Sequence, residues 1–157
     1  MSFRKIAALL VMLAGPLAAQ HPDFSGKWTY DATASSSTMM GGPVSMTMTV
    51  TQTDKSLKTE QQSQTPMGNQ NATLTYALDG SPSKNTVDAQ GTPLTLNSTA
   101  VWEGATLTIT TDAEIQGQSL KVVEHWSLDS AGKVLTMTSD LNVAGQSMSQ
   151  KRVFNKS

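Results

Sequence analysis

Apolar and polar residues alternate along most of this chain, which is the pattern of antiparallel strands with one buried face. In the segment 44–52, two valines and two methionines share one face, while serine and threonine occupy the other. The segments 105–111 and 118–128 repeat the pattern. No segment after residue 20 shows the sustained period of 3.6 residues that is typical of an amphipathic helix. We therefore expect an all-β protein.

Turn sequences separate the alternating runs at short intervals. Pairs such as Asp79-Gly80 and Glu103-Gly104 are typical of tight turns. The pattern predicts strands near 24–30, 44–53, 57–64, 71–78, 84–89, 94–102, 105–111, 118–128, 133–143 and 146–155. Sequential strands with short loops form an antiparallel up-and-down meander. Closure into a lipocalin-like barrel of about 8–10 strands removes open edges and leaves room for one small ligand.

One connection, residues 31–43, is longer than the others. It is rich in serine and glycine and contains no alternating run. Its composition favours a loop over a helix. We expect either a flap at the mouth of the barrel or a solvated connector.

Residues 1–19 are predicted to be a secretory signal peptide. Two cations precede an apolar run over residues 6–14, and the small residues of Leu17-Ala18-Ala19 suit cleavage before Gln20. The apolar run has about half of the roughly 18 residues that a membrane span needs. We expect residues 20–157 to form a single exported domain, periplasmic or extracellular, with no integral membrane segment after signal cleavage.

Charge and cysteine content exclude several classes of function. The formal net charge of −1 becomes −3 when the two cations of the leader are removed. This mild acidity gives no electrostatic footprint for nucleic acid, so no nucleic-acid partner is expected. Cysteine is absent, which excludes thiol catalysis and disulfides and leaves stability to a packed core. The sequence leaves the oligomeric state open.

Two short motifs lie near opposite ends of the chain, Phe24-Ser25-Gly26-Lys27-Trp28 and Arg152-Val153-Phe154. Alternation places Phe24, Gly26 and Trp28 on one face, where the glycine allows a neighbouring side chain to approach the backbone. Arg152 and Phe154 share the inner face of the last strand. A buried guanidinium needs a partner, and the ring face of Trp28 would supply one worth roughly 0.5–2 kcal/mol. These five residues are expected to close the barrel.

The end motifs resemble those of the calycins, the superfamily of lipocalins and fatty-acid-binding proteins. Gly26-Lys27-Trp28 is similar to the lipocalin Gly-x-Trp, and Arg152 sits where that family's last-strand arginine packs across the tryptophan. The whole first motif also resembles the Phe-x-Gly-x-Trp opening of fatty-acid-binding proteins, and Arg152-Val153-Phe154 resembles their closing Arg-x-Tyr, which grips a ligand carboxylate. Bacterial exported proteins described as lipocalin-like have a similar layout. The resemblance implies a ligand-binding barrel.

The chain departs from both families in ways that concern the ligand more than the fold. Phe154 replaces the tyrosine of Arg-x-Tyr and cannot donate a hydrogen bond to a carboxylate. Residues 31–43 are too few for the two helices of fatty-acid-binding proteins. There is no lipocalin disulfide and no evident C-terminal helix.

We expect the barrel to bind a small hydrophobic or amphipathic molecule non-covalently, because apolar inner positions with a few polar interruptions are typical of a small-molecule pocket. Arg152 either binds an anionic head group or only closes the barrel. Glu124 is expected to pair with Arg152 or to point into a wet cavity, unless a bulge brings it to the surface. The predicted ligand-binding residues are Trp28, Tyr76, Trp102, Glu124, Trp126 and Arg152. A filled barrel that presents its threonine-rich outer surface to a protein partner is the alternative.

Catalytic and metal-binding motifs are lacking. His21 lies in the N-terminal segment and His125 on the predicted outer face, and neither has the spacing of a zinc site. No nucleophile elbow, phosphate-binding loop or dinucleotide fingerprint occurs. We therefore expect a protein that is not an enzyme and has no cofactor. Binding of Cu(I) by methionines such as Met46 and Met48 is a distant alternative, because methionine on an alternating strand usually fills the core.

Overall fold

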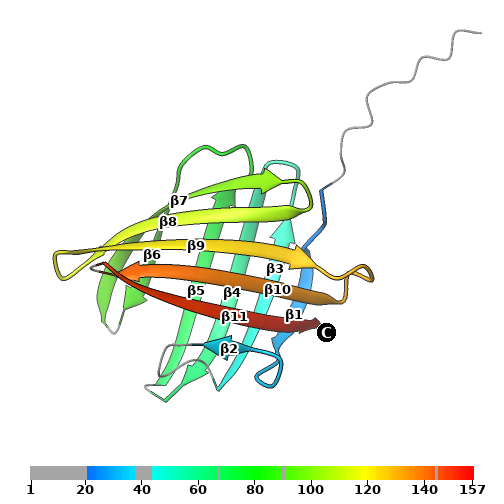
Figure 1. The fold of residues 1–157 in the computed structure, drawn as a ribbon, viewed down its shortest axis with the longest axis horizontal. Coiled ribbons are helices and arrows are strands. Elements are labelled where there is room, and N and C mark those ends of the chain that lie inside the picture. The colour runs from blue at the N-terminus through cyan, green and yellow to red at the C-terminus, as the bar shows by residue number, and fades with distance from the viewer. Residues whose placement is uncertain (1–20, 38–43, 67, 90, 144) are drawn as a thin grey trace, which may run out of the picture.

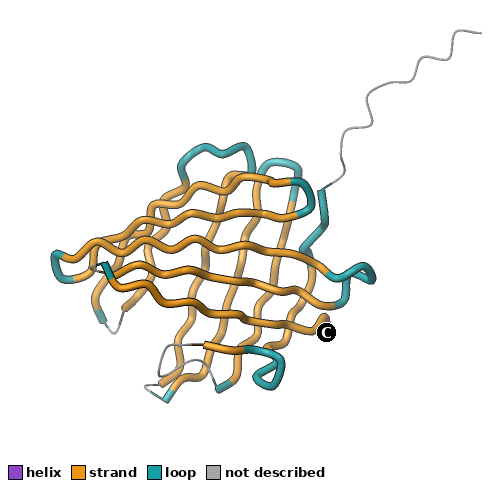
Figure 2. The backbone as a smooth tube through the Cα atoms, viewed as in Figure 1, coloured by secondary structure: helices purple, strands orange, loops and turns teal. Residues whose placement is uncertain are grey.

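The computed structural model describes residues 21–37, 44–66, 68–89, 91–143 and 145–157. The predicted signal peptide lies outside them. The strands are β1 (Gly26–Tyr30), β2 (Ser36–Ser37), β3 (Ser45–Gln52), β4 (Ser56–Thr65), β5 (Gly68–Ala77), β6 (Ser83–Ala89), β7 (Thr92–Glu103), β8 (Thr106–Ile115), β9 (Gln118–Leu128), β10 (Val134–Val143) and β11 (Gln146–Lys156). Figure 2 shows them joined by short loops. The described residues form no helix long and apolar enough to cross a membrane.

The strands form one antiparallel sheet in the order β5-β4-β3-β1-β11-β10-β9-β8-β7-β6. The first strand, β1, pairs with the last, β11, with Trp28 opposite Lys156 and Tyr30 opposite Phe154. In Figure 1, strands β8–β11 run across strands β3–β5, so the sheet folds over on itself and encloses its inner face. The predicted up-and-down meander barrel and the meeting of its two ends are therefore confirmed.

Side chains, rather than a strand ladder, close the remaining seam between β5 and β6. Asn85 Oδ1 accepts a hydrogen bond from the Thr75 amide at 2.8 Å, and Asn85 Nδ2 donates one to the Thr75 carbonyl at 3.0 Å. Ser83 Oγ accepts from the Ala77 amide at 2.8 Å. The amide of Asn85 thus supplies the donor and acceptor that a neighbouring strand would otherwise provide.

Replacing Asn85 with alanine should loosen this seam. Because both bonds to Thr75 are lost at a partly hydrated edge, we expect the free energy of unfolding to fall by about 1–2 kcal/mol. Urea denaturation measures the loss, and faster hydrogen exchange at the Thr75 amide localises it. Lys84→Ala, at an exposed neighbouring position, is the control and should cost less than about 0.5 kcal/mol. Equal losses in the two variants would contradict a structural role for Asn85.

Large apolar side chains fill one end of the barrel, which we call the closed end. Phe24 stacks on Trp102 and meets Trp126 edge-on, with both pairs of ring centroids 5.7 Å apart. Trp28 Nε1 donates a hydrogen bond of 2.9 Å to the Phe24 carbonyl. The side chains at this end that are at most 1% exposed include Phe24, Trp28, Met48, Leu57, Leu107, Trp126, Leu135, Met137 and Phe154. Alternation places all of these strand residues on the inner face.

The first part of the long connection lies along the last strand. The Asp31 amide donates to the Val153 carbonyl at 2.8 Å, and the Val153 amide donates to Ser35 Oγ at 2.9 Å. Strand β2 then pairs with β11 at Gln150 and Lys151. This short strand was not predicted, because two serines carry no alternation. Residues 38–43, on which the choice between flap and connector depends, lie outside the described residues.

Candidate functional site

Polar side chains form a layer inside the barrel next to the closed end, which we call the polar band. Its members are Thr59, Gln61, Tyr76, Ser98, Thr111, Glu124, Ser139, Gln150 and Arg152. Alternation puts each on the inner face of its strand, and Thr59, Ser98 and Ser139 are at most 3% exposed. Buried polar groups require hydrogen-bond partners. Ser98 Oγ and Thr111 Oγ1 are 2.8 Å apart, and Gln61 Nε2 donates to Thr59 Oγ1 at 3.3 Å.

An ion pair between Glu124 and Arg152 lies in this band. The two residues come from β9 and β11, so their side chains meet across the intervening strand β10. Glu124 Oε1 accepts hydrogen bonds from Arg152 Nη2 and from Ser139 Oγ of β10, the latter at 3.0 Å. Strand β9 pairs with both neighbours in continuous register, which keeps Glu124 on the inner face. The expected pairing is confirmed, and the alternative of a bulge that exposes Glu124 is wrong.

The expected packing of Arg152 across Trp28 is wrong, because the register places a different cation there. Lys156 lies opposite Trp28, and its Nζ sits 5.2 Å from the centroid of the indole. Arg152 lies earlier in β11, opposite Met137. Gly26 makes room for the lysine: a Cβ at this position would stand 2.7 Å from Lys156 Cε, and its φ of 139° favours glycine. The close approach expected at Gly26 is thus present, with Lys156 as the partner.

The Glu124–Arg152 pair is only partly hydrogen-bonded. It is joined through one oxygen and one nitrogen, and the buried Arg152 Nε has no hydrogen-bond partner among the described residues. Glu124 Oε2 likewise accepts no bond from them. The Glu124 and Arg152 side chains are 14% and 16% exposed.

Tyr76 lies in the same band and is shielded from water. Burial raises the pKa of its phenol, the negative charge of Glu124 raises this pKa further, and the positive charge of Arg152 lowers it. The phenol is therefore neutral beside a pair whose charges cancel.

Beyond the polar band, the inner face carries a set of apolar residues that remain partly open to solvent. We call these residues the accessible wall. They are Ala72, Leu74, Leu94, Leu96, Ala113, Leu120, Val122, Leu141 and Met148, all half-buried. Their neighbours in sequence are mostly polar and point outward, which fixes their own direction. Apolar walls that end at a few polar groups are the usual lining of a small-molecule site.

The structure divides the six predicted ligand-binding residues into two groups. Tyr76, Glu124 and Arg152 come together in the polar band. The three tryptophans lie at the closed end, where Trp28 and Trp126 are 1% exposed and Trp102 is partly buried. His21 stacks on Trp102 with the ring centroids 4.3 Å apart. That these six residues contact a ligand stays a prediction.

Sequence reasoning missed Ser139, which binds the Glu124 carboxylate. Its position offered a signal, because it occupies the inner register of a strand between the apolar Met137 and Leu141. A lone hydroxyl at such a position requires an interior partner. Sequence reasoning also missed Lys156, which carries no pattern that distinguishes it from an exposed terminal lysine.

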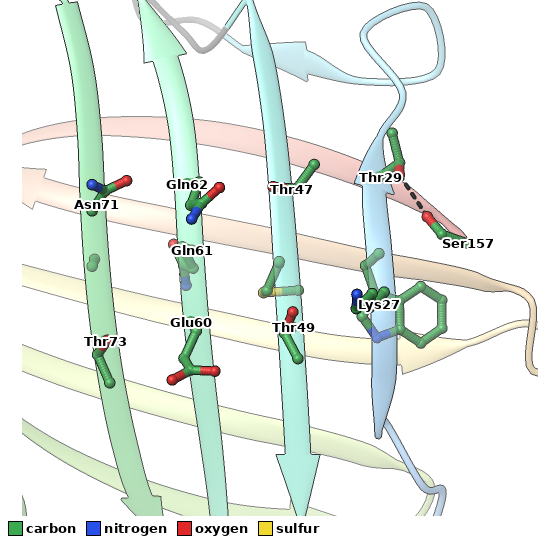
Figure 3. A pocket seen from close by; sticks show the side chains of 13 residues that line it. Lys27, Thr29, Thr47, Thr49, Glu60, Gln61, Gln62, Asn71, Thr73 and Ser157 are labelled. Atoms are coloured by element: carbon green, nitrogen blue, oxygen red, sulfur yellow. Dashed lines mark hydrogen bonds between the residues drawn. The ribbon is translucent and has the colours of Figure 1, made fainter.

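A hollow of about 660 Å³ lies on the outer face of β1, β3, β4 and β5. Figure 3 shows side chains of these strands around it. Its outward-facing lining is Lys27, Thr29, Thr47, Thr49, Glu60, Gln62, Asn71, Thr73 and Ser157. These residues alternate with inward residues such as Trp28 and Met48, so the strands separate this hollow from the interior. Its outward-facing side chains are all polar or charged, so the lining is rich in hydrogen-bonding groups.

The described residues contain no group of three His, Asp or Glu side chains placed to hold a metal ion. Met46, Met48 and Met137 pack in the core, at most 5% exposed. Such packing explains these methionines as apolar core residues. Met39, Met40 and Met67 lie outside the described residues.

Solved structures with the same fold were found by comparison of backbones. One is zebrafish ileal bile acid-binding protein in complex with cholic acid, with a TM-score of 0.55, 17% identity, and coverage of 85% of this chain and 98% of that one. Another is a secretory abundant heat soluble protein from Ramazzottius varieornatus, with a TM-score of 0.53, 12% identity, and coverage of 88% and 98%. No protein-family model and no curated protein matches the sequence. The barrel has a calycin-like fold.

Proposed function

We propose that this protein is exported and binds a small hydrophobic or amphipathic molecule inside the barrel, without catalysing a reaction. The observation that carries the proposal is the accessible wall, which ends at the partly bonded Glu124–Arg152 pair. A filled barrel would bury those apolar side chains as completely as the closed end does. The complex of the zebrafish protein with cholic acid, an amphipathic molecule, supports this proposal.

A pair of tryptophan substitutions on β8 tests where the molecule binds. Ala113 belongs to the accessible wall, whereas the adjacent Asp112 is exposed on the outer face. Ala113→Trp should fill the interior and weaken binding of a neutral apolar dye by about tenfold or more, equivalent to about 1.4 kcal/mol. Asp112→Trp should leave the affinity within about twofold. Isothermal titration calorimetry is the measurement, because the added indoles change the fluorescence.

Two outcomes of this titration contradict the proposal in different ways. Equal affinities in Ala113→Trp, Asp112→Trp and the unmodified protein would place the dye outside the barrel. Absence of binding in the unmodified protein, to the dye and to fatty acids, would favour the filled barrel.

The proposal that the protein is exported is supported by residues 1–19, with their two cations, apolar run and small-residue cleavage site. Protein recovered from outside the cytoplasm should have the mass of residues 20–157. Recovery of the full-length chain in the cytoplasm would contradict export.

A further inference from the structure

The charge of the polar band restricts the head group that the interior accepts. A guanidinium at the end of an apolar wall suits a carboxylate when it stands alone. Here Glu124 already pairs with it, and Ser139 holds the carboxylate by a second hydrogen bond to the same oxygen. A ligand carboxylate near Arg152 would therefore stand beside Glu124. Two carboxylates that share one cation repel each other strongly away from bulk water.

The pair nevertheless leaves hydrogen-bonding capacity of both kinds. A guanidinium has five N–H donors, and one joins Arg152 to Glu124. On the acid, Oε2 accepts no hydrogen bond from the described residues. The exposed 16% and 14% of these side chains is the part that a ligand can reach. An uncharged group that both accepts and donates, such as a primary amide or an alcohol, matches this arrangement.

Resting on the proposed function, we infer that the barrel selects amphipathic molecules with a neutral head group that donates and accepts hydrogen bonds, and discriminates against carboxylates. The head group accepts from Arg152 and donates to Glu124 Oε2, while the alkyl or ring portion lies along the accessible wall. The ion pair stays intact in the complex, so no buried charge loses its partner.

A ligand series of constant chain length tests this inference on the unmodified protein. Decanamide, decan-1-ol and decanoic acid are compared at pH 7 for displacement of a neutral apolar dye. The amide or the alcohol should displace the dye at about tenfold lower concentration than the acid. Equal or stronger displacement by the acid would overturn the inference but leave ligand binding established. Failure of the dye and of all three molecules to bind would overturn the proposed function, and the inference with it.

The variant Glu124→Gln tests the inference independently, because the preference for the amide over the acid should disappear in it. The substitution keeps the shape of the side chain but leaves the charge of Arg152 uncompensated, so decanoic acid should gain about tenfold in affinity. Decanamide loses Oε2 as an acceptor and should therefore not gain. Glu114→Gln, which removes the same charge at an exposed position of β8, is the matched control. Circular dichroism confirms that both variants fold. An unchanged preference in a folded Glu124→Gln would show that Glu124 does not set the selectivity.

Discussion

Replacing Trp28 with phenylalanine is expected to destabilise the protein more than the same replacement at Trp126. Both indoles are 1% exposed at the closed end, so each change removes a similar buried volume. They differ in their ring nitrogens. Trp28 Nε1 donates to the Phe24 carbonyl at 2.9 Å, whereas the buried Trp126 Nε1 has no partner among the described residues. Removal of a bonded donor leaves its acceptor without a partner. Removal of an unbonded buried donor also removes the cost of burying that donor away from water.

The expected losses are about 2–4 kcal/mol for Trp28→Phe and about 1 kcal/mol for Trp126→Phe. Alanine at either position should cost about 3–5 kcal/mol, because neither cavity can collapse among strands fixed on both sides. Urea denaturation, followed by far-ultraviolet circular dichroism, measures all four variants without depending on the indole that is removed. A larger loss for Trp126→Phe than for Trp28→Phe would contradict this account of the closed end.

Alternation along the chain predicts which face of a strand is buried, and this explains how much of the fold can be predicted. The segments 57–64 and 118–128 coincide with β4 and β9 to within one residue at each end. Alternation predicts the face of the sheet toward which each side chain points, but it does not predict the register between neighbouring strands. A shift of two residues keeps every side chain on the same face but changes its cross-strand partner. Arg152 was correctly placed on the inner face, yet Lys156 is the cation opposite Trp28.

Features that depend on contacts between strands, and not on the pattern within one strand, were the least predictable. In sequence, Asn85 resembles any polar residue of a partly exposed strand. Its role in closing the seam between β5 and β6 arises only because β5 lies beside it in the fold. Strand β2 forms because β11 presents free backbone groups beyond the end of β1. The Glu124–Arg152 pair was predictable for the opposite reason. An inward carboxylate and an inward guanidinium each require a partner, and few charged groups are available inside.

Removing either member of that pair should cost more stability than removing both. Glu124→Met leaves a largely buried guanidinium without its counterion, and Arg152→Met leaves a carboxylate in the same state. Each should lower the free energy of unfolding by about 2–4 kcal/mol, at the lower end of the range for buried pairs because the side chains keep some access to solvent. The double variant replaces both charges with apolar side chains that suit the accessible wall. It should therefore recover most of the loss.

The exposed pair Lys58–Glu60 supplies the control for this double-mutant cycle. Its Nζ and Oε1 are 2.8 Å apart, but its side chains are 47% and 54% exposed. Solvent screens such a pair, so its coupling energy should be below about 1 kcal/mol and should fall further at high salt. A coupling energy for Glu124 and Arg152 no larger than that of the exposed pair would show that the interior around them is wet throughout. The two carboxylates would then not compete for Arg152, and selection against an anionic head group would lose its physical basis.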